Sequence, residues 1–219
     1  MKIAVRGGHC PRIPGCSKFI DELTEDRKVK DSVIKYLKQL GCNVLDVTPP
    51  DDISSSSADL SYGVNKANNW GADLFVSIHF NKAYDIYNAD LGSEVCVYCP
   101  FDTAQRVVNG LAGLGFKNRG QKVRTNLYEL KHSNMKSMII EVCFVESTGD
   151  VCLYKHLGVD LIGKTIAESI TDKKVSINNN ESELNYSMYL FSKNWYLKQY
   201  EDVAKSGYKN KKIIKLFYI

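Results

Sequence analysis

Two histidines and a glutamate lie where the ends of strands and the start of a helix are expected. His9 follows the apolar residues 3–5 and two glycines, and His79 is near the end of the apolar stretch DLFVSIHF at 73–80. Glu22 lies a few residues before a long helical pattern. Strand ends in an α/β sheet converge at one edge, so residues this far apart in sequence can be neighbours in space. Two imidazoles and one carboxylate form a His₂Glu set, which leaves a fourth tetrahedral position for water, as a catalytic zinc requires.

A second glutamate is a candidate for the proton carrier that a hydrolytic zinc site needs. Glu141 lies inside MIIEVCF, within the apolar stretch at residues 137–145. A carboxylate in a buried strand is unfavourable unless it has a partner or a function. Near a metal, Glu141 would take up a proton and pass it on.

Each of these four residues also has an ordinary structural explanation, and spacing alone leaves both interpretations open. His9 after a glycine pair fits a turn, and His79 fits a core histidine that is bonded to a backbone carbonyl. Glu22 fits the first turn of a helix, where acids favour the helix dipole. Glu141 fits an ion pair with a lysine at the end of the sheet.

Strand and helix patterns alternate along the first 170 residues. Strands are expected where apolar runs are short and continuous, and helices where apolar residues recur every three or four positions. This alternation predicts an α/β fold with a mainly parallel sheet and helices on both faces. The expected strands span residues 2–7, 42–49, 73–80, 92–99 and 137–145, and the expected helices span 26–41, 58–72, 102–116 and 158–170.

Composition narrows the class of protein. The 219 residues are 44% hydrophobic and 25% charged, as in ordinary globular proteins, and no apolar run approaches the ~20 residues of a membrane span. The net charge of +4 is compatible with an anionic polymer as substrate but does not indicate nucleic acid. Seven irregularly spaced cysteines favour a reducing compartment. The pair CVYC at 96–99 has no second pair and therefore does not indicate a zinc ribbon.

Taken together, these residues resemble the pattern of a known family. These are the zinc-dependent N-acetylmuramoyl-L-alanine amidases of the Amidase 3 type, found in bacterial autolysins and phage endolysins. Their pattern has a Gly-His after the first strand, a Glu leading into a long helix, a Ser-Ile-His-x-Asn-like segment, and a Glu in a late apolar strand. The matching parts of this chain are GGH at 7–9, Glu22, SIHFN with His79 and Asn81, and IIEVCF with Glu141.

The resemblance covers residues 1–171 and implies a fold, a cofactor and roles for these residues. The implied fold is a twisted mixed sheet of about six strands flanked by helices. The cofactor is one Zn²⁺. Glu141 is implied to be the catalytic acid and base. The implied zinc ligands are His9, Glu22 and His79.

The resemblance also bears on Asn81, on Glu25 and on the residues that flank His9. Asn81 is implied to lie at the cleft and to bind substrate. Glu25 also precedes the helix and is the alternative to Glu22 as the carboxylate ligand. The family usually has Asp-Pro-Gly-His-Gly in its first motif, whereas this chain has Arg6 at the start of that motif and Cys10 at its end.

The activity that the resemblance implies is hydrolysis of the amide bond between N-acetylmuramic acid and L-alanine in peptidoglycan. One rival is a zinc peptidase that cuts within the stem peptide, although the HExxH helix of one large peptidase class is absent. The other rival is a wall-binding protein whose zinc site has decayed, which Arg6 and Cys10 keep open.

Beyond residue 171 the composition changes. Residues 172–185 are polar and rich in asparagine, which is typical of a linker. Residues 186–219 form a short aromatic and basic segment, too short to hold a large core alone. It contains NWYLKQYEDVAKSGYKN, which is similar to the opening of a repeat in surface proteins. The segment is therefore either a truncated wall-binding repeat or an element that docks on the first domain.

The expected partner is the peptidoglycan of a Gram-positive wall, with no nucleic acid and no membrane span. The start MKIAVRGGHC does not have the pattern of a signal peptide. We therefore expect synthesis in the cytoplasm and action at the wall after holin-type release or cell lysis, as for a phage or prophage endolysin. The sequence indicates no particular oligomeric state.

Overall fold

A computed structural model describes residues 1–53 and 55–176 of the chain. Strands and helices alternate along the described part, as the sequence predicts. The predicted C-terminal segment at 186–219 and most of the predicted linker lie outside the described residues. The elements are β1 (Lys2–Gly7), α1 (Glu22–Gln39), β2 (Asn43–Asp46), α2 (Ser56–Trp70), β3 (Leu74–Asn81), β4 (Ser93–Val97), α3 (Asp102–Gly113), β5 (Asn118–Val123), α4 (Tyr128–His132), β6 (Lys136–Phe144) and α5 (Thr148–Thr171).

The six strands form one sheet in the order β2-β1-β3-β6-β4-β5. Strands β2, β1, β3 and β6 run parallel, whereas β4 is antiparallel to β6 and parallel to β5. The mixed, mainly parallel sheet that the sequence predicts is therefore confirmed. Because β1, β3 and β6 are parallel neighbours, their carboxyl ends meet at one edge of the sheet, which is where α/β proteins bind ligands.

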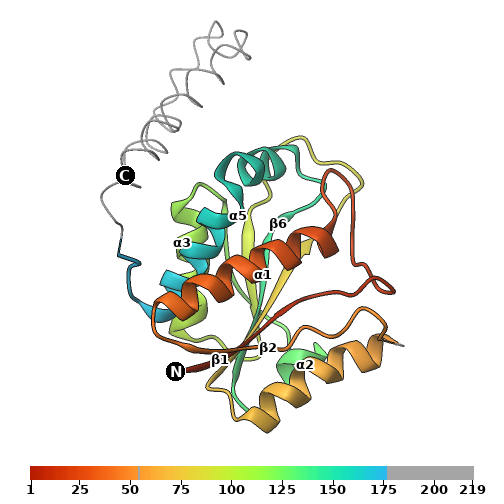
Figure 1. Ribbon diagram of the computed structural model, residues 1–219. Helices are drawn as coiled ribbons and strands as arrows, with labels where there is room; N and C mark the ends of the chain where they lie inside the picture. The colour runs from red at the N-terminus through yellow and green to blue at the C-terminus, as the bar shows by residue number, and fades with distance from the viewer. Residues whose placement is uncertain (54, 177–219) are drawn as a thin grey trace, which may run out of the picture. The chain divides into compact units, whose positions relative to one another are not determined.

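Helices cover both faces of the sheet, as predicted (Figure 1). Helices α1, α3 and α5 pack on one face, and α2 and α4 pack on the other. Strand β1 shows the reason, since Ile3 and Val5 join the larger core cluster under α1 while Ala4 joins the cluster under α2. A strand that buries both faces in this way has the continuous apolar sequence from which it was predicted.

Two helix starts differ from the prediction by four residues or more. Helix α1 begins at Glu22 rather than residue 26, because the Asp21 side chain caps it by accepting the Thr24 N–H at 2.9 Å. Helix α5 begins at Thr148 rather than residue 158. Gly158, at φ 76°, kinks this long helix, and the predicted helix covers only the part that begins at the kink.

The sequence did not predict β5 or α4. Strand β5 has the polar sequence NRGQKV and forms the edge of the sheet, where it has no need of an apolar run. Helix α4 has only five residues, too few to show a helical period. Within the described residues, no helix is both long and apolar enough to cross a membrane.

Candidate metal centre

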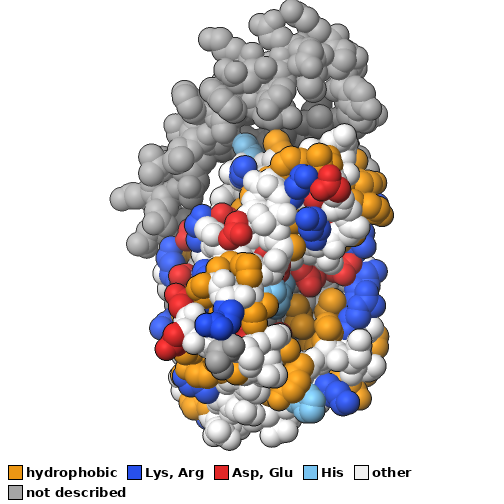
Figure 2. Space-filling model, turned by 90° about the vertical axis from the view of Figure 1, so that its right-hand side faces the viewer, with side chains coloured by type: hydrophobic (Ala, Val, Ile, Leu, Met, Phe, Trp, Pro, Cys, Tyr) orange, Lys and Arg blue, Asp and Glu red, His pale blue; other side chains and the backbone are white. Residues whose placement is uncertain are grey.

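All five residues that the sequence singled out line one open cleft of about 360 Å³. The cleft lies at the carboxyl edge of the parallel strands, where histidine and acidic side chains gather in a hollow of the surface (Figure 2). Helix α1 begins beside this edge, and its first residue, Glu22, lines the cleft. The five residues are His9, Glu22, His79, Asn81 and Glu141.

Glu22 lies between the two histidines. Its Oε1 is 3.1 Å from His9 Nε2 and 3.2 Å from His79 Nδ1. One ligand atom from each of these three residues lies within 4.8 Å of the others. We call this set, His9, Glu22 and His79, the metal centre.

The outer nitrogen of each histidine has its own partner. His9 Nδ1 is 3.1 Å from the carbonyl of Ile13, and His79 Nε2 is 3.1 Å from the hydroxyl of Ser77. A carbonyl only accepts hydrogen bonds, so His9 donates from Nδ1, and Nε2 is the nitrogen that faces Glu22 and is available to a metal. The Ser77 hydroxyl can accept from His79 Nε2, since it donates to Glu129 Oε1 at 3.4 Å, and Nδ1 is the His79 nitrogen that faces Glu22.

This donor set fits a metal cation. Two imidazole lone pairs and a carboxylate oxygen converge on one point, and electron-rich atoms converge stably only around a cation or a shared proton. Two backbone groups hold Glu22 in place, since Cys16 N–H donates to Oε2 at 2.8 Å and Phe80 N–H donates to Oε1 at 3.0 Å. The ligands are therefore held by the fold in addition to their contacts with one another.

Two glycines leave room for the rings. A Cβ at Gly8 would lie 2.2 Å from the His79 ring, and a Cβ at Gly15 would lie 2.3 Å from the Glu22 carboxylate. Gly15 also has a φ of +76°, which other residues rarely adopt. The glycines next to His9 and before Glu22 are thus required by the metal centre itself.

The charges of the metal centre shift its pKa values. Burial opposes the charged form of Glu22, but hydrogen bonds from His79 and His9 outweigh burial and hold the pKa of this carboxyl well below its usual range. Burial likewise lowers the pKa of His79, but Glu129 and Glu22 outweigh it and raise that pKa well above its usual value. These three side chains thus favour positive charge at the point where they meet.

Glu141 lies next to the metal centre on strand β6, in register with His79 on β3. Its Oε2 is buried and has no hydrogen-bond partner within the described part of the chain. Burial raises the pKa of Glu141 to about 7, although the nearby His79 opposes this shift. A carboxyl of this kind can both accept and release a proton near neutral pH.

The hydrogen-bond partners of Asn81 and Glu25 show which of the two side chains lies at the cleft. Asn81 Nδ2 donates to Glu94 Oε1 at 3.3 Å, at the rim of the cleft. Glu25 turns away, because its two carboxylate oxygens accept from Tyr154 at 2.6 Å and Lys28 at 2.9 Å. Of the two acids in the first turn of α1, only Glu22 reaches the histidines.

Three buried residues near the metal centre were not predicted as site residues, namely Arg6, Ser77 and Glu129. Arg6 stood out only as a departure from the family motif. One signal was available, because an arginine inside an apolar strand requires a buried acid as partner. Glu129 lies between apolar neighbours in LYEL and satisfies that requirement, with an oxygen 3.0 Å from Arg6 Nη1.

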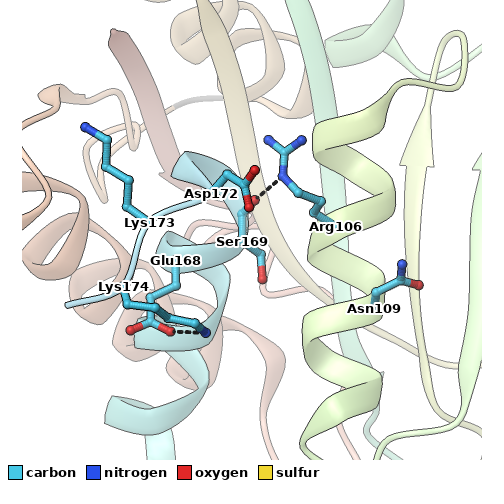
Figure 3. A pocket seen from close by; sticks show the side chains of 7 residues that line it. All are labelled: Arg106, Asn109, Glu168, Ser169, Asp172, Lys173 and Lys174. Atoms are coloured by element: carbon cyan, nitrogen blue, oxygen red, sulfur yellow. Dashed lines mark hydrogen bonds and ion pairs between the residues drawn. The ribbon is translucent and has the colours of Figure 1, made fainter.

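A second hollow, of about 390 Å³, lies between α3 and the end of α5 (Figure 3). Arg106 points across it and donates to the carbonyls of Ser169 and Ile170 at 3.0 and 3.2 Å, which caps the end of α5. Lys174 pairs with Glu168 at 2.8 Å. These charges have partners in the fold, and no histidine lines this hollow.

The fold and the site define an α/β domain with two histidines and a glutamate, which could hold a metal ion, at the carboxyl edge of its sheet. A family model described as N-acetylmuramoyl-L-alanine amidase, Amidase_3, matches residues 3–172. The chain belongs to this family.

Relatives of known sequence or structure agree with this assignment. An uncharacterized protein of Clostridium perfringens is 47% identical over 184 residues, which cover 81% of this chain and 54% of that protein. The sporulation-specific N-acetylmuramoyl-L-alanine amidase of Bacillus subtilis is 31% identical over 103 residues, covering 44% of this chain and 38% of the amidase. The chain spans about half the length of the first curated relatives it matches.

Among solved structures, the catalytic domain of an endolysin targeting Clostridia Difficile superposes with a TM-score of 0.73 at 26% identity. The match covers 80% of this chain and 99% of that domain. The described residues therefore share the architecture of nearly all of that endolysin catalytic domain.

Proposed function

We propose that this chain hydrolyses the amide bond between N-acetylmuramic acid and L-alanine in peptidoglycan, with one Zn²⁺ held by His9, Glu22 and His79. The observation that carries the proposal is the convergence of these three ligand atoms within 4.8 Å, in a cleft of an amidase-family domain. Three nitrogen and oxygen ligands with an open fourth position are the arrangement of catalytic zinc.

The chemistry that a bound zinc supplies is polarisation of a carbonyl and a lowered pKa for water, toward ~7. The side chains that would bind the zinc are already oriented by the fold. The outer hydrogen bonds of His9 and His79 keep the inner nitrogen of each ring directed at Glu22, so the ligands need little rearrangement on binding.

Glu141 is proposed to carry the proton. Water adds its oxygen to the lactyl carbonyl carbon, and Glu141 Oε2 takes up the proton that the water loses. Glu141 then gives this proton to the leaving nitrogen as the carbon–nitrogen bond breaks. The products are a carboxylic acid on the lactyl group, which ionises by losing the second water proton to solvent, and a free amino terminus on L-alanine, and Glu141 returns to its starting state.

Asn81 is proposed to bind substrate at the rim of the cleft. Its side-chain amide has one N–H directed at Glu94 and a second N–H for a carbonyl of the glycan or stem peptide. Arg119 donates to Glu94 at 2.7 Å, which fixes the carboxylate that orients Asn81.

The proposed place of action is the Gram-positive cell wall. A domain at residues 1–171 carries the whole proposed site, and a linker at 172–185 is proposed to join it to the segment at 186–219. The endolysin among the structural relatives supports the proposed route, in which the protein reaches the wall once the membrane has been opened.

The test is a product assay on purified Gram-positive peptidoglycan, with and without a zinc chelator. We expect new L-alanine amino termini that vanish with chelator and return with added zinc, and no new reducing sugar ends. Amino termini from another stem residue would make the protein a peptidase. No cleavage by the folded, zinc-loaded protein would make it a binding module.

A further inference from the structure

Arg6 is a fully buried guanidinium at the end of β1. Its Nη1 lies 3.0 Å from Glu129 Oε1, and its Nη2 lies 2.8 Å from Asp59 Oδ2. Both carboxylates are also buried. A buried charge needs such partners to be tolerated, yet a well-packed apolar side chain would serve stability as well or better. A role in stability alone therefore does not account for this cluster.

One side of the cluster holds the turn that leads to His9. Arg6 donates from Nε to the carbonyl of Gly7 at 2.9 Å and from Nη2 to the carbonyl of Gly8 at 2.8 Å. The Gly8 N–H in turn donates to the Ile78 carbonyl on β3 at 2.9 Å. The backbone just before His9 is thus held by one side chain and one neighbouring strand.

The other side of the cluster reaches the ring of His79. The Ser77 hydroxyl is 3.1 Å from His79 Nε2 and 3.4 Å from Glu129 Oε1, so it can accept from the ring and donate to the carboxylate. Glu129 Oε2 lies 3.9 Å from the same Nε2, too far for a direct hydrogen bond but close enough to attract its proton. Both contacts favour a proton on Nε2, which leaves Nδ1 for the metal.

We propose that Arg6 and Glu129 are positioning residues of the metal centre, an inference that rests on the proposed zinc function. Arg6 places His9 through the Gly7 and Gly8 carbonyls. Glu129 places His79 and selects its tautomer, directly by charge and through the Ser77 hydroxyl. Neither residue is assigned a contact with substrate. Arg6, the residue that departs from the family's first motif, would then help to hold the metal centre in place.

The first readout is the affinity of the intact chain for Zn²⁺, measured by competition with a chromophoric chelator. We expect Glu129→Gln to weaken binding by about 10- to 100-fold, the usual effect of losing a carboxylate that supports a metal ligand. Arg6→Lys keeps the charge but lacks the fork that reaches both glycine carbonyls and both acids, so we expect a loss as well. Ser77→Ala introduces no unpaired charge, and it tests the same link if a charge variant fails to fold.

A matched control separates positioning from general stability. Asp150 is a buried carboxylate that accepts from the backbone of Gly92 and Phe144 at 2.9–3.2 Å, with no histidine among its partners. We expect Asp150→Asn to lower the thermal stability of the protein and to leave zinc affinity unchanged.

The second readout is the ¹⁵N spectrum of the imidazoles in the zinc-loaded protein. The proposal expects His79 to carry its proton on Nε2 and to bind through Nδ1, and His9 to show the opposite pattern. In Ser77→Ala and Glu129→Gln, we expect the Nε2–H signal of His79 to broaden or shift, which a purely structural role would not cause.

The outcomes separate this inference from the proposed function. If the wild type binds zinc and releases L-alanine termini, but folded Glu129→Gln and Ser77→Ala bind zinc as tightly as the wild type, the inference is overturned and the function stands. If the variants lose affinity but the wild type releases no termini, the inference stands and the amidase function fails. A wild type that binds no zinc overturns both.

Discussion

His79 on β3 and Glu141 on β6 are register partners on neighbouring parallel strands. Adjacent strands lie about 4.8 Å apart, so the backbone itself fixes the separation between the proposed ligand and the proposed proton carrier. Because both strands lie in the middle of the sheet and are buried on both faces, neither residue can shift without disturbing the core. This arrangement suits a carboxylate that acts on a group beside the metal.

Replacing Glu141 by glutamine should separate catalysis from metal binding. Glutamine has nearly the same shape but cannot accept and return a proton, so we expect Glu141→Gln to lower the release of L-alanine termini by about 10²- to 10⁴-fold. Zinc affinity should stay close to that of the wild type. Glu168→Gln, in the hollow of Figure 3, is the remote control. Near-normal activity of Glu141→Gln would remove this residue from the mechanism.

The cap of α1 should matter for the site as well as for stability. Asp21 caps the helix whose first residue is Glu22, and Ser55 caps α2 by accepting the Ala58 N–H at 3.2 Å. We expect Asp21→Ala and Ser55→Ala each to lower the free energy of unfolding by about 1 kcal/mol. Only Asp21→Ala should also weaken zinc binding, as chelator competition would show. Equal zinc affinity in both variants would contradict a link between the cap and Glu22.

A methyl group at Gly8 should disturb the ring of His79. Its Cβ would lie 2.2 Å from the ring, so we expect Gly8→Ala to displace His79 and to weaken zinc binding by about tenfold or more. Gly113 is an exposed residue at the end of α3 with no atom near its would-be Cβ, and it serves as the matched control. Gly113→Ala should be neutral or stabilise the fold by up to about 1 kcal/mol.

The ion pair of Lys30 and Asp46 should give a pH-dependent stability. Burial alone would raise the pKa of the Asp46 carboxyl, but Lys30, 2.8 Å away, and Thr48 outweigh burial and lower it. A lowered pKa in the folded state stabilises the protein above the unfolded value of about 3.9, and this stabilisation is lost as the pH falls through the folded value.

We therefore expect Asp46→Asn to flatten the acid side of the stability curve. Urea midpoints measured from about pH 6 down to about pH 2 should fall less for the variant than for the wild type. The difference at neutral pH should stay below about 1 kcal/mol, because the Asp46 side chain is 43% exposed. Parallel curves over the whole range would show that this pair contributes no pH dependence.

Much of the fold follows from local sequence patterns. The apolar runs at 2–7, 73–80 and 137–145 predicted buried strands, since strands covered on both faces must be apolar throughout. Strand β5 was not predicted, because an edge strand such as NRGQKV does not have to be apolar. The start of α1 was predicted too late in the chain, because the cap at Asp21, and not apolar periodicity, determines where this helix begins.

By itself, the sequence determined the α/β class, the family and five of the residues that line the cleft, because these depend on local periodicity and on motifs a few residues long. Tertiary structure decided which nitrogen of each histidine faces Glu22 and which first-turn acid reaches them. It also decided that Arg6 is held between buried acids beside the site. Several of these features depend on contacts between residues 50 or more positions apart, such as His79 with Glu22 and Arg6 with Glu129, and only the packed sheet brings such residues together.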